Sequence, residues 1–204
     1  MRRAGTTLED EQRRHARLIA RLGAARPRRV QYTIDLLAEL WSEPAYLHTC
    51  LGGYVHWQVR PSATDLQVVA SFAADAAPAI RRATFAALQH AGDTAATLLA
   101  TFDRGLGDPD AMVRLFAARI VHSLGLGSEL LDALAGRLCD PVWSVRWHAA
   151  AALAGTPAAG AARDALASSR PERGPALEVW EACSRDLDLR SAGRAHQHDR
   201  DVVR

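Results

Sequence analysis

Apolar residues recur along much of the chain at intervals of three or four positions, the spacing that places side chains on one face of an α-helix. The clearest run covers residues 28–41, and its apolar members are Val30, Ile34, Leu37, Leu40 and Trp41. Another run, over residues 8–22, mixes apolar residues with arginine and glutamate, and Thr7 and Asp10 suit its start. It predicts an amphipathic helix that caps the N-terminal end. Because every apolar period is close to that of a helix, we predict an all-α fold.

The helices of the remaining chain are predicted to form pairs. First helices are expected from Leu66 to Phe72 and near residues 93–105, 128–139 and 157–168. Second helices are expected from about Ala45 to Trp57 and near residues 78–90, 110–124 and 142–154. A kink or break is expected in the second helix of the first pair, because Gly52 and Gly53 lie in its middle. An interior glycine costs about 1 kcal/mol relative to alanine.

The turn within each pair carries a motif that is repeated after 32 residues, from Asp108 to Asp140. The two copies share an Asp-Pro, a Val-Arg and an Ala-Ala pair: Asp108-Pro109, Val113-Arg114 and Ala117-Ala118, then Asp140-Pro141, Val145-Arg146 and Ala149-Ala150. A third copy begins at Asp75, 33 residues before Asp108. Such a period is typical of a stacked helical array, in which each unit needs its neighbours to bury its apolar face. We predict that Asp108 and Asp140 cap the helices that follow, with the prolines in the first turn.

The motif Asp-Pro-x-x-x-Val-Arg, followed by small residues and a leucine, resembles the turn and second helix of a HEAT repeat. The resemblance implies a right-handed α-α superhelix, a HEAT-like solenoid, with about five helix pairs and an N-terminal capping helix. It also implies a ladder of hydrogen bonds between aspartates and arginines of neighbouring units, whose members here are Asp75, Asp108, Arg114, Asp140 and Arg146. Arg114 and Arg146 are therefore interpreted as structural residues before ligand contacts.

We expect one solenoid domain over residues 1–187 and a flexible tail over residues 188–204, which contain few apolar residues. Within this domain the capping helix at 8–22 precedes five repeats, near 28–60, 61–91, 92–125, 126–155 and 156–187. The last repeat is degenerate and is expected to close the C-terminal end.

Composition narrows the class of protein. A chain of 204 residues with 49% hydrophobic residues is long enough to bury a substantial core. No apolar run reaches the ~18 residues of a membrane span, and the first residues lack the apolar segment of an export signal. We therefore expect a cytoplasmic protein with no membrane partner.

The sequence contains no group of residues with the spacing typical of a metal or cofactor site. The three cysteines lack the spacing of a zinc site or a disulfide framework, and they are Cys50, Cys139 and Cys183. In the tail, His196 and His198 lie near Asp199 without a third fixed partner. We predict no metal and no cofactor.

Charge is distributed unevenly. Residues 1–30 contain nine arginines against Glu9, Asp10 and Glu11, whereas residues 31–169 contain nine arginines against thirteen acidic residues. A mildly acidic array argues against a channel that follows a phosphate backbone, because such a channel would show a basic stripe along its repeats. The arginine face of the first helix has two interpretations, a solvated surface or an electrostatic contact for an anionic partner, and its members are Arg13, Arg14, Arg17 and Arg21.

In arrays of this kind, the resemblance implies that second helices line a concave surface. Its residues fall four, seven, eleven and fourteen places after the turn aspartate. With the neighbouring Trp143, these places predict a ligand-binding groove made of Tyr54, Trp57, Arg82, Met112, Leu115, Arg119, His122, Trp143 and Trp147. The set is largely apolar and aromatic, as in binding surfaces rich in energetic hot spots.

Two other interpretations of this face stay open. A terminal helix folds over these residues, or the helical phase is shifted by one residue and Trp147 belongs to the core. Trp143 and Trp147 are four positions apart, so at least one of them is expected to face the groove in either phase.

The preferred function is a non-enzymatic interaction or scaffold module that holds a peptide or protein in the groove. The chain contains no glycine-rich phosphate loop and no H-E-x-x-H or G-x-S-x-G motif. The alternative is a DNA-binding protein of the HEAT-like alkylpurine DNA glycosylase type, because Trp147, Arg82 and Arg119 are similar to part of that family's concave set. The groove positions contain no aspartate or glutamate, so a nucleic-acid partner is less favoured than a protein.

Overall fold

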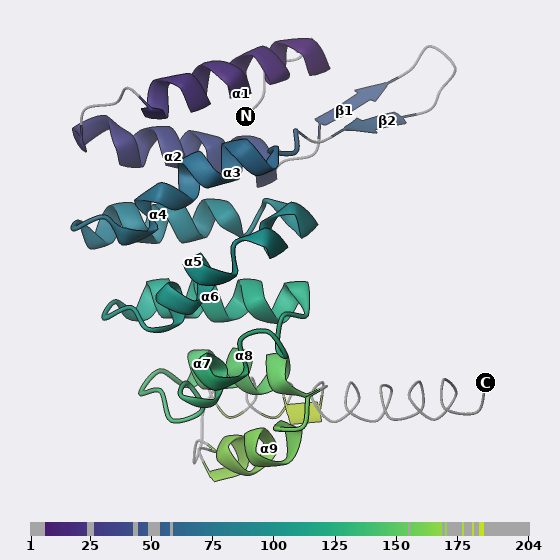
Figure 1. Cartoon of the computed structure of the whole chain (residues 1–204). Coiled ribbons are helices and arrows are strands. Elements are labelled where there is room, and N and C mark those ends of the chain that lie inside the picture. Colours follow the sequence, from purple (N-terminus) through teal and green to yellow (C-terminus); the bar gives the residue numbers. More distant parts are fainter. Residues whose placement is uncertain are drawn as a thin grey trace. The chain divides into compact units, whose positions relative to one another are not determined.

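The computed structural model describes residues 7–23, 27–42, 45–48, 54–57, 59–154 and 156–168, and five isolated positions between 170 and 185. The chain divides into two compact units, Met1–Thr101 and Phe102–Arg204, and each is described by itself. Figure 1 shows that helices make up most of the described residues, as the apolar periodicity predicts. That residues 1–187 form one domain stays a prediction.

The first unit contains helices α1 to α4 and a β-hairpin. Its elements are α1 (Leu8–Gly23), α2 (Pro27–Ser42), β1 (Ala45–His48), β2 (Tyr54–Trp57), α3 (Ala63–Ala70), the 3-10 helix η1 (Ser71–Ala74), α4 (Pro78–Leu88) and the 3-10 helix η2 (Gly92–Thr97). α1 packs against α2 and α3, and α2 packs against α4 (Figure 1). The unit boundary falls within α5 (Leu99–Leu106).

Local sequence explains where α1 begins and which residues α2 buries. Thr7 Oγ1 accepts the backbone N–H of Asp10 at 3.2 Å, and Asp10 Oδ2 accepts the backbone N–H of Thr7 at 3.1 Å. This reciprocal pair satisfies N–H groups that have no partner within the helix. The predicted apolar stripe of α2 is confirmed as core, because its five members are all at most 4% exposed: Val30, Ile34, Leu37, Leu40 and Trp41.

The prediction of a second helix from about Ala45 to Trp57 is wrong. β1 and β2 are antiparallel, with Ala45 opposite Trp57 and His48 opposite Tyr54, so a hairpin lies where the helix was expected (Figure 1). β2 consists of aromatic and β-branched residues together with His56, a composition that favours strands. The sequence between the strands contains the Gly52–Gly53 pair, which disfavours a continuous helix and is common in hairpin loops.

The second unit contains α6 (Ala111–Leu124), α7 (Leu131–Ala135), α8 (Trp143–Leu153) and α9 (Ala159–Ser168). α8 packs against all three of the others. The predicted second helices near 78–90, 110–124 and 142–154 are confirmed as α4, α6 and α8. The first helices α5, α7 and α9 are shorter than predicted, and α7 covers only Leu131–Ala135 of the expected 128–139. In the first unit, α3 begins three residues before the predicted Leu66. Gly125 ends α6 in the left-handed conformation with φ 70°, and Gly127 and Gly136 flank α7, which limits its length.

The predicted helix caps require a correction. The N-cap of α6 is Asp110, whose carboxylate accepts the N–H groups of Met112 and Val113, and α8 begins after Val142. Asp108 and Asp140 lie two residues before these caps, and each accepts the N–H of the residue two positions later, at 2.8 and 3.0 Å. Pro109 and Pro141 therefore stand in the turn, not in the first helical turn. The aspartates shape the turn instead of ending the helix.

The predicted C-terminal elements fall largely outside the described residues. This holds for most of the last helix predicted around Leu177 and Trp180, of which Leu177 is described, and for the tail 188–204 with His196 and His198. Two of the cysteines, Cys50 and Cys183, also lie outside the described residues. The third, Cys139, is an exposed free thiol. Within the described part of the chain, no helix is long and apolar enough to cross a membrane.

Candidate binding face on α6 and α8

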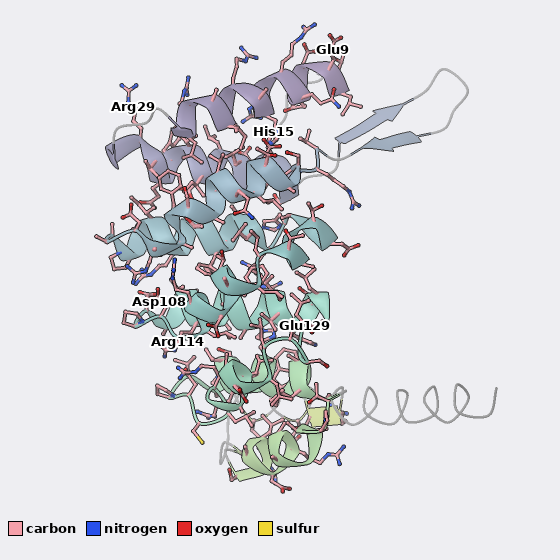
Figure 2. The ribbon with its side chains drawn as sticks, in the orientation of Figure 1. Glu9, His15, Arg29, Asp108, Arg114 and Glu129 are labelled. Carbon is pink, nitrogen blue, oxygen red and sulfur yellow. The ribbon has the colours of Figure 1, made fainter. Side chains whose placement is uncertain are left out.

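A buried ion pair fixes α6 relative to the turn before α8. Arg114 Nε donates to Asp140 Oδ2 at 2.7 Å, and Arg114 Nη2 donates to Asp140 Oδ1 at 3.1 Å. The two residues are only 8% and 3% exposed. Arg114 Nη1 also donates to the carbonyl oxygens of Asp108 and Pro109 at 3.0 and 3.1 Å, in the turn before α6 (Figure 2). A two-pronged guanidinium–carboxylate contact of this kind specifies geometry as well as supplying free energy.

The same arginine position closes the turn in each copy of the motif. Arg81 Nη1 donates to the carbonyl oxygens of Asp75 and Ala76 at 2.9 and 3.3 Å. Arg146 Nη1 likewise donates to the carbonyl oxygen of Asp140 at 2.6 Å. Arg81 was absent from the predicted ladder, although its place six residues after Asp75 is the signal that could have identified it.

The charge state of Asp140 follows from these contacts. Burial alone would raise its pKa, but the hydrogen bonds from Arg114 and Val142, together with the charges of Arg114 and Arg137, outweigh burial and lower the pKa below its ordinary value. Asp140 is therefore ionised in the folded protein at neutral pH.

One side of α6 is accessible. Met112 is 42% exposed, Arg119 is exposed, and Leu115 and His122 are half-buried. The opposite side is core, and its residues are at most 2% exposed: Val113, Ala117, Ala118, Ile120 and Val121. The four groove positions predicted on α6 thus share its accessible side.

The accessible surface continues onto the first half of α8. Trp143, Trp147 and His148 are half-buried there. Farther along the helix, Ala151 and Ala154 are only 1% and 6% exposed, so the accessible surface ends before the C-terminal end of α8. We name the surface formed by Met112, Leu115, Arg119 and His122 of α6 with Trp143, Trp147 and His148 of α8 the α6–α8 face.

Three aromatic side chains meet across this face. The ring centroids of His122 and Trp147 are 5.4 Å apart at an interplanar angle of 90°, and those of Trp147 and His148 are 4.4 Å apart at 61°. The Nδ1 atoms of His122 and His148 are 3.2 Å apart, so one ring donates a hydrogen bond to the other. Edge-to-face packing of this kind adds about 0.5–1.5 kcal/mol beyond burial for aromatic pairs.

His148 did not emerge from the sequence as a site residue. In the repeat it occupies the place of Phe116, so the signal that could have identified it is a histidine where the preceding copy has an apolar ring. Burial lowers the pKa of His148 to about 3, and electrostatic interactions with His122 and Arg119 act in the same direction. The ring is therefore neutral at physiological pH and acts as a packing and hydrogen-bonding group.

This cluster predicts a stability loss in weak acid. Between pH ~6.5 and ~3 the unfolded chain binds a proton at His148 that the folded chain excludes, so the free energy of unfolding falls as pH falls through this range. Replacing His148 by phenylalanine, as at Phe116, removes the titrating group and keeps a flat ring.

The expected result is a smaller fall in melting temperature for His148→Phe than for the wild type between about pH 7 and about pH 5, measured by circular dichroism. Burial also lowers the pKa of His15, in the first unit, but His15 is present in both proteins and does not affect the difference. Equal falls in the two proteins would show that His148 is not excluded from protonation.

The other predicted groove residues lie in the first unit. Arg82 is exposed on α4. Tyr54 and Trp57 belong to β2 and not to a second helix, as the corrected secondary structure requires. The α6–α8 face thus contains six of the nine predicted residues: Met112, Leu115, Arg119, His122, Trp143 and Trp147.

Among the residues that the structure describes, no three His, Cys, Asp or Glu side chains are grouped so that they could hold a metal ion. The indole N–H of Trp147 is buried and finds no acceptor in the described part of the chain. The arrangement therefore offers apolar and aromatic surface with one exposed guanidinium.

Comparison with known proteins identifies the fold. No family model matches the chain. No curated protein matches it either. A designed armadillo repeat protein in complex with the peptide (KR)4 is similar in structure, with a TM-score of 0.61, 13% sequence identity, and coverage of 88% of this chain and 85% of that one.

Two further solved structures agree. A second designed armadillo repeat protein has a TM-score of 0.58 at 14% identity, covering 82% of this chain and 79% of its own. An engineered protein has a TM-score of 0.59 at 16% identity, covering 88% and 85%. Likeness at such low identity concerns the fold alone, and it shows that this chain has the fold of a helical-repeat solenoid of the armadillo-like kind.

Proposed function

We propose that this chain is a non-enzymatic protein-interaction module that binds a peptide or a segment of another protein on the α6–α8 face. The observation that carries the proposal is the exposure of Met112 together with half-buried Leu115 and Trp147 on the accessible sides of two packed helices. Large apolar side chains that stay accessible in a fold with a well-buried core are typical of binding surfaces.

The residue types on this face suit a protein ligand. Trp and Arg are the side chains most often found among energetic hot spots, and Trp147 and Arg119 are both present. Trp147 is held by edge-to-face contact with His122, so little conformational entropy is lost when a ligand packs against it. Exposed Arg119 supplies a donor for a backbone carbonyl or a carboxylate of the ligand.

The similarity in fold to a protein in complex with a peptide supports a peptide as the class of ligand, but it does not indicate the sequence of that peptide. One solved neighbour holds the basic peptide (KR)4. The α6–α8 face contains exposed Arg119 and no acidic residue, so it offers a basic peptide no carboxylate partner. We therefore propose a ligand with apolar anchor residues in a peptide segment that is neutral or acidic.

The test begins with peptides selected from a random displayed library against the immobilised protein. For a selected peptide, Trp147→Ala and Leu115→Ala should each weaken binding by ~2 kcal/mol, as expected for buried anchors. Leu8→Ala provides a matched control, because Leu8 is an exposed leucine, 37% accessible, on α1. Dissociation constants are measured by fluorescence anisotropy at low and physiological salt.

The DNA-binding alternative predicts a strong effect of salt and of arginine substitutions on affinity. Affinity for duplex DNA would fall steeply between low and physiological salt, because phosphate contacts release counterions, and it would be lost on replacing Arg82 and Arg119. Such behaviour, or wild-type affinity of the Trp147→Ala protein for the selected peptides, would refute binding of protein on the α6–α8 face.

A further inference from the structure

A hollow of about 270 Å³ lies on α1 and α2, in the first unit and separate from the α6–α8 face. It is lined by Arg14, Arg17 and Arg21 together with Leu18 and Leu36. We name these five residues the arginine hollow. In Figure 1, α1 is the outermost helix of its unit, with α2 and α3 packed against it.

The arginines of this hollow have few acidic partners within the described part of the chain. Arg17 donates through Nε to the carbonyl oxygen of Arg13 at 3.2 Å, and neither Arg17 nor Arg21 forms an ion pair within the described part of the chain. Arg14 Nη1 lies 3.6 Å from Oε2 of the buried Glu11. By contrast, Arg13, which does not line the hollow, pairs with both Glu9 and Asp10. Positive charge is thus concentrated where the surface is hollowed.

The hollow is apolar between its charges. Leu18 is 5% exposed and Leu36 is half-buried, so aliphatic surface separates the guanidinium groups. One turn before Leu36, Tyr32 lies on the same side of α2 and is 62% exposed. Aliphatic side chains in a ligand would bury this surface, whereas a sugar-phosphate backbone offers none.

The spacing of the arginines defines the ligand further. A helix rises 1.5 Å per residue, so Arg17 and Arg21, the two arginines without an ion pair among the described residues, start about 6 Å apart along α1. Two carboxylates one turn apart on a helical ligand have the same spacing.

We propose that the arginine hollow binds an acidic amphipathic helix of a partner protein. Its carboxylates pair with Arg17 and Arg21, and an apolar side chain between them packs on Leu18 and Leu36. Charge complementarity selects this partner and speeds its association, and the apolar contact distinguishes it from other polyanions.

The experiment uses the full chain and a labelled helical heptad peptide with two glutamates a turn apart and one leucine between them in each heptad. Fluorescence anisotropy should detect binding to the wild type that falls about fivefold to tenfold in the double variant Arg17→Gln, Arg21→Gln, given the modest strength of exposed ion pairs. Arg13→Gln is the matched control and should bind as the wild type does. Replacing the peptide leucines by glutamine should also weaken binding.

Several results would overturn the proposal. They are absence of peptide binding, equal affinity for the wild type and the double variant, and no effect of removing the peptide leucines. A single-stranded oligonucleotide of equal charge that binds more tightly than the peptide would assign the hollow to nucleic acid instead. Circular dichroism melting of the double variant serves as the folding control, because Arg17 and Arg21 are exposed and their removal should leave the melting temperature unchanged.

Discussion

Replacing Asp140 by alanine is expected to lower the free energy of unfolding by about 3–5 kcal/mol, because it leaves the guanidinium of Arg114 buried without its carboxylate. Arg114 donates to both oxygens of Asp140, and their side chains are only 10% and 0% exposed. The loss also frees the N–H of Val142, which Asp140 accepts at 3.0 Å. Urea denaturation followed by circular dichroism measures the change.

Asp110→Ala is the matched control for this prediction. Asp110 caps α6 by accepting the N–H groups of Met112 and Val113 at 3.0 and 3.2 Å, and losing such a cap typically costs ~1 kcal/mol. Equal losses for the two variants would mean that the buried pair stabilises the second unit no more than a surface cap does.

The same pair predicts a pH dependence. The pKa of Asp140 is lowered in the folded protein, so its contribution to stability is fully present above the unfolded pKa and is lost as pH falls through the folded pKa. The stability difference between the wild type and Asp140→Asn should therefore narrow in acid. A difference that stayed constant down to about pH 2 would show that the carboxylate does not need its charge.

Gly127→Ala is expected to lower the free energy of unfolding by about 3 kcal/mol, at the upper end of overpacking costs. A Cβ at this position would lie 2.0 Å from the carbonyl oxygen of Ala152 and 2.9 Å from its carbonyl carbon. Both atoms belong to the backbone of α8, which cannot move aside without disturbing the packing of α8 on its neighbours. Thermal and urea denaturation should both report the loss.

Gly136→Ala provides the comparison in the same unit. There a Cβ would meet the carbonyl oxygen of Ala133 at 3.5 Å, an ordinary contact, and the φ of Gly136 is −62°, which alanine adopts freely. This variant should be neutral or slightly stabilising, because alanine restricts the unfolded chain. A Gly127→Ala protein as stable as Gly136→Ala would contradict the close approach of the 127 loop to α8.

Much of the candidate site could be predicted from single helices. On α6, the spacing of Met112, Leu115, Arg119 and His122 after the turn motif is enough to place them on one side, because helical periodicity is a local property. The sequence could not identify His148 as a partner of His122, since the two residues are 26 positions apart and meet only when α6 packs on α8. Nor could it show that Ala151 and Ala154, at equivalent places of the next copy, are buried.

The sequence by itself determined the helical-repeat class and the three second helices α4, α6 and α8, because apolar periodicity acts within a few residues. Only the tertiary structure decided the rest. A hairpin forms at Ala45–Trp57, where a helix was expected, and the N-cap of α6 is Asp110 instead of Asp108. The tertiary structure also brought Gly127 against Ala152. The last of these features depends on a contact between residues distant in sequence. In the other two cases the local sequence permits two competing conformations and does not specify which one the folded chain stabilises.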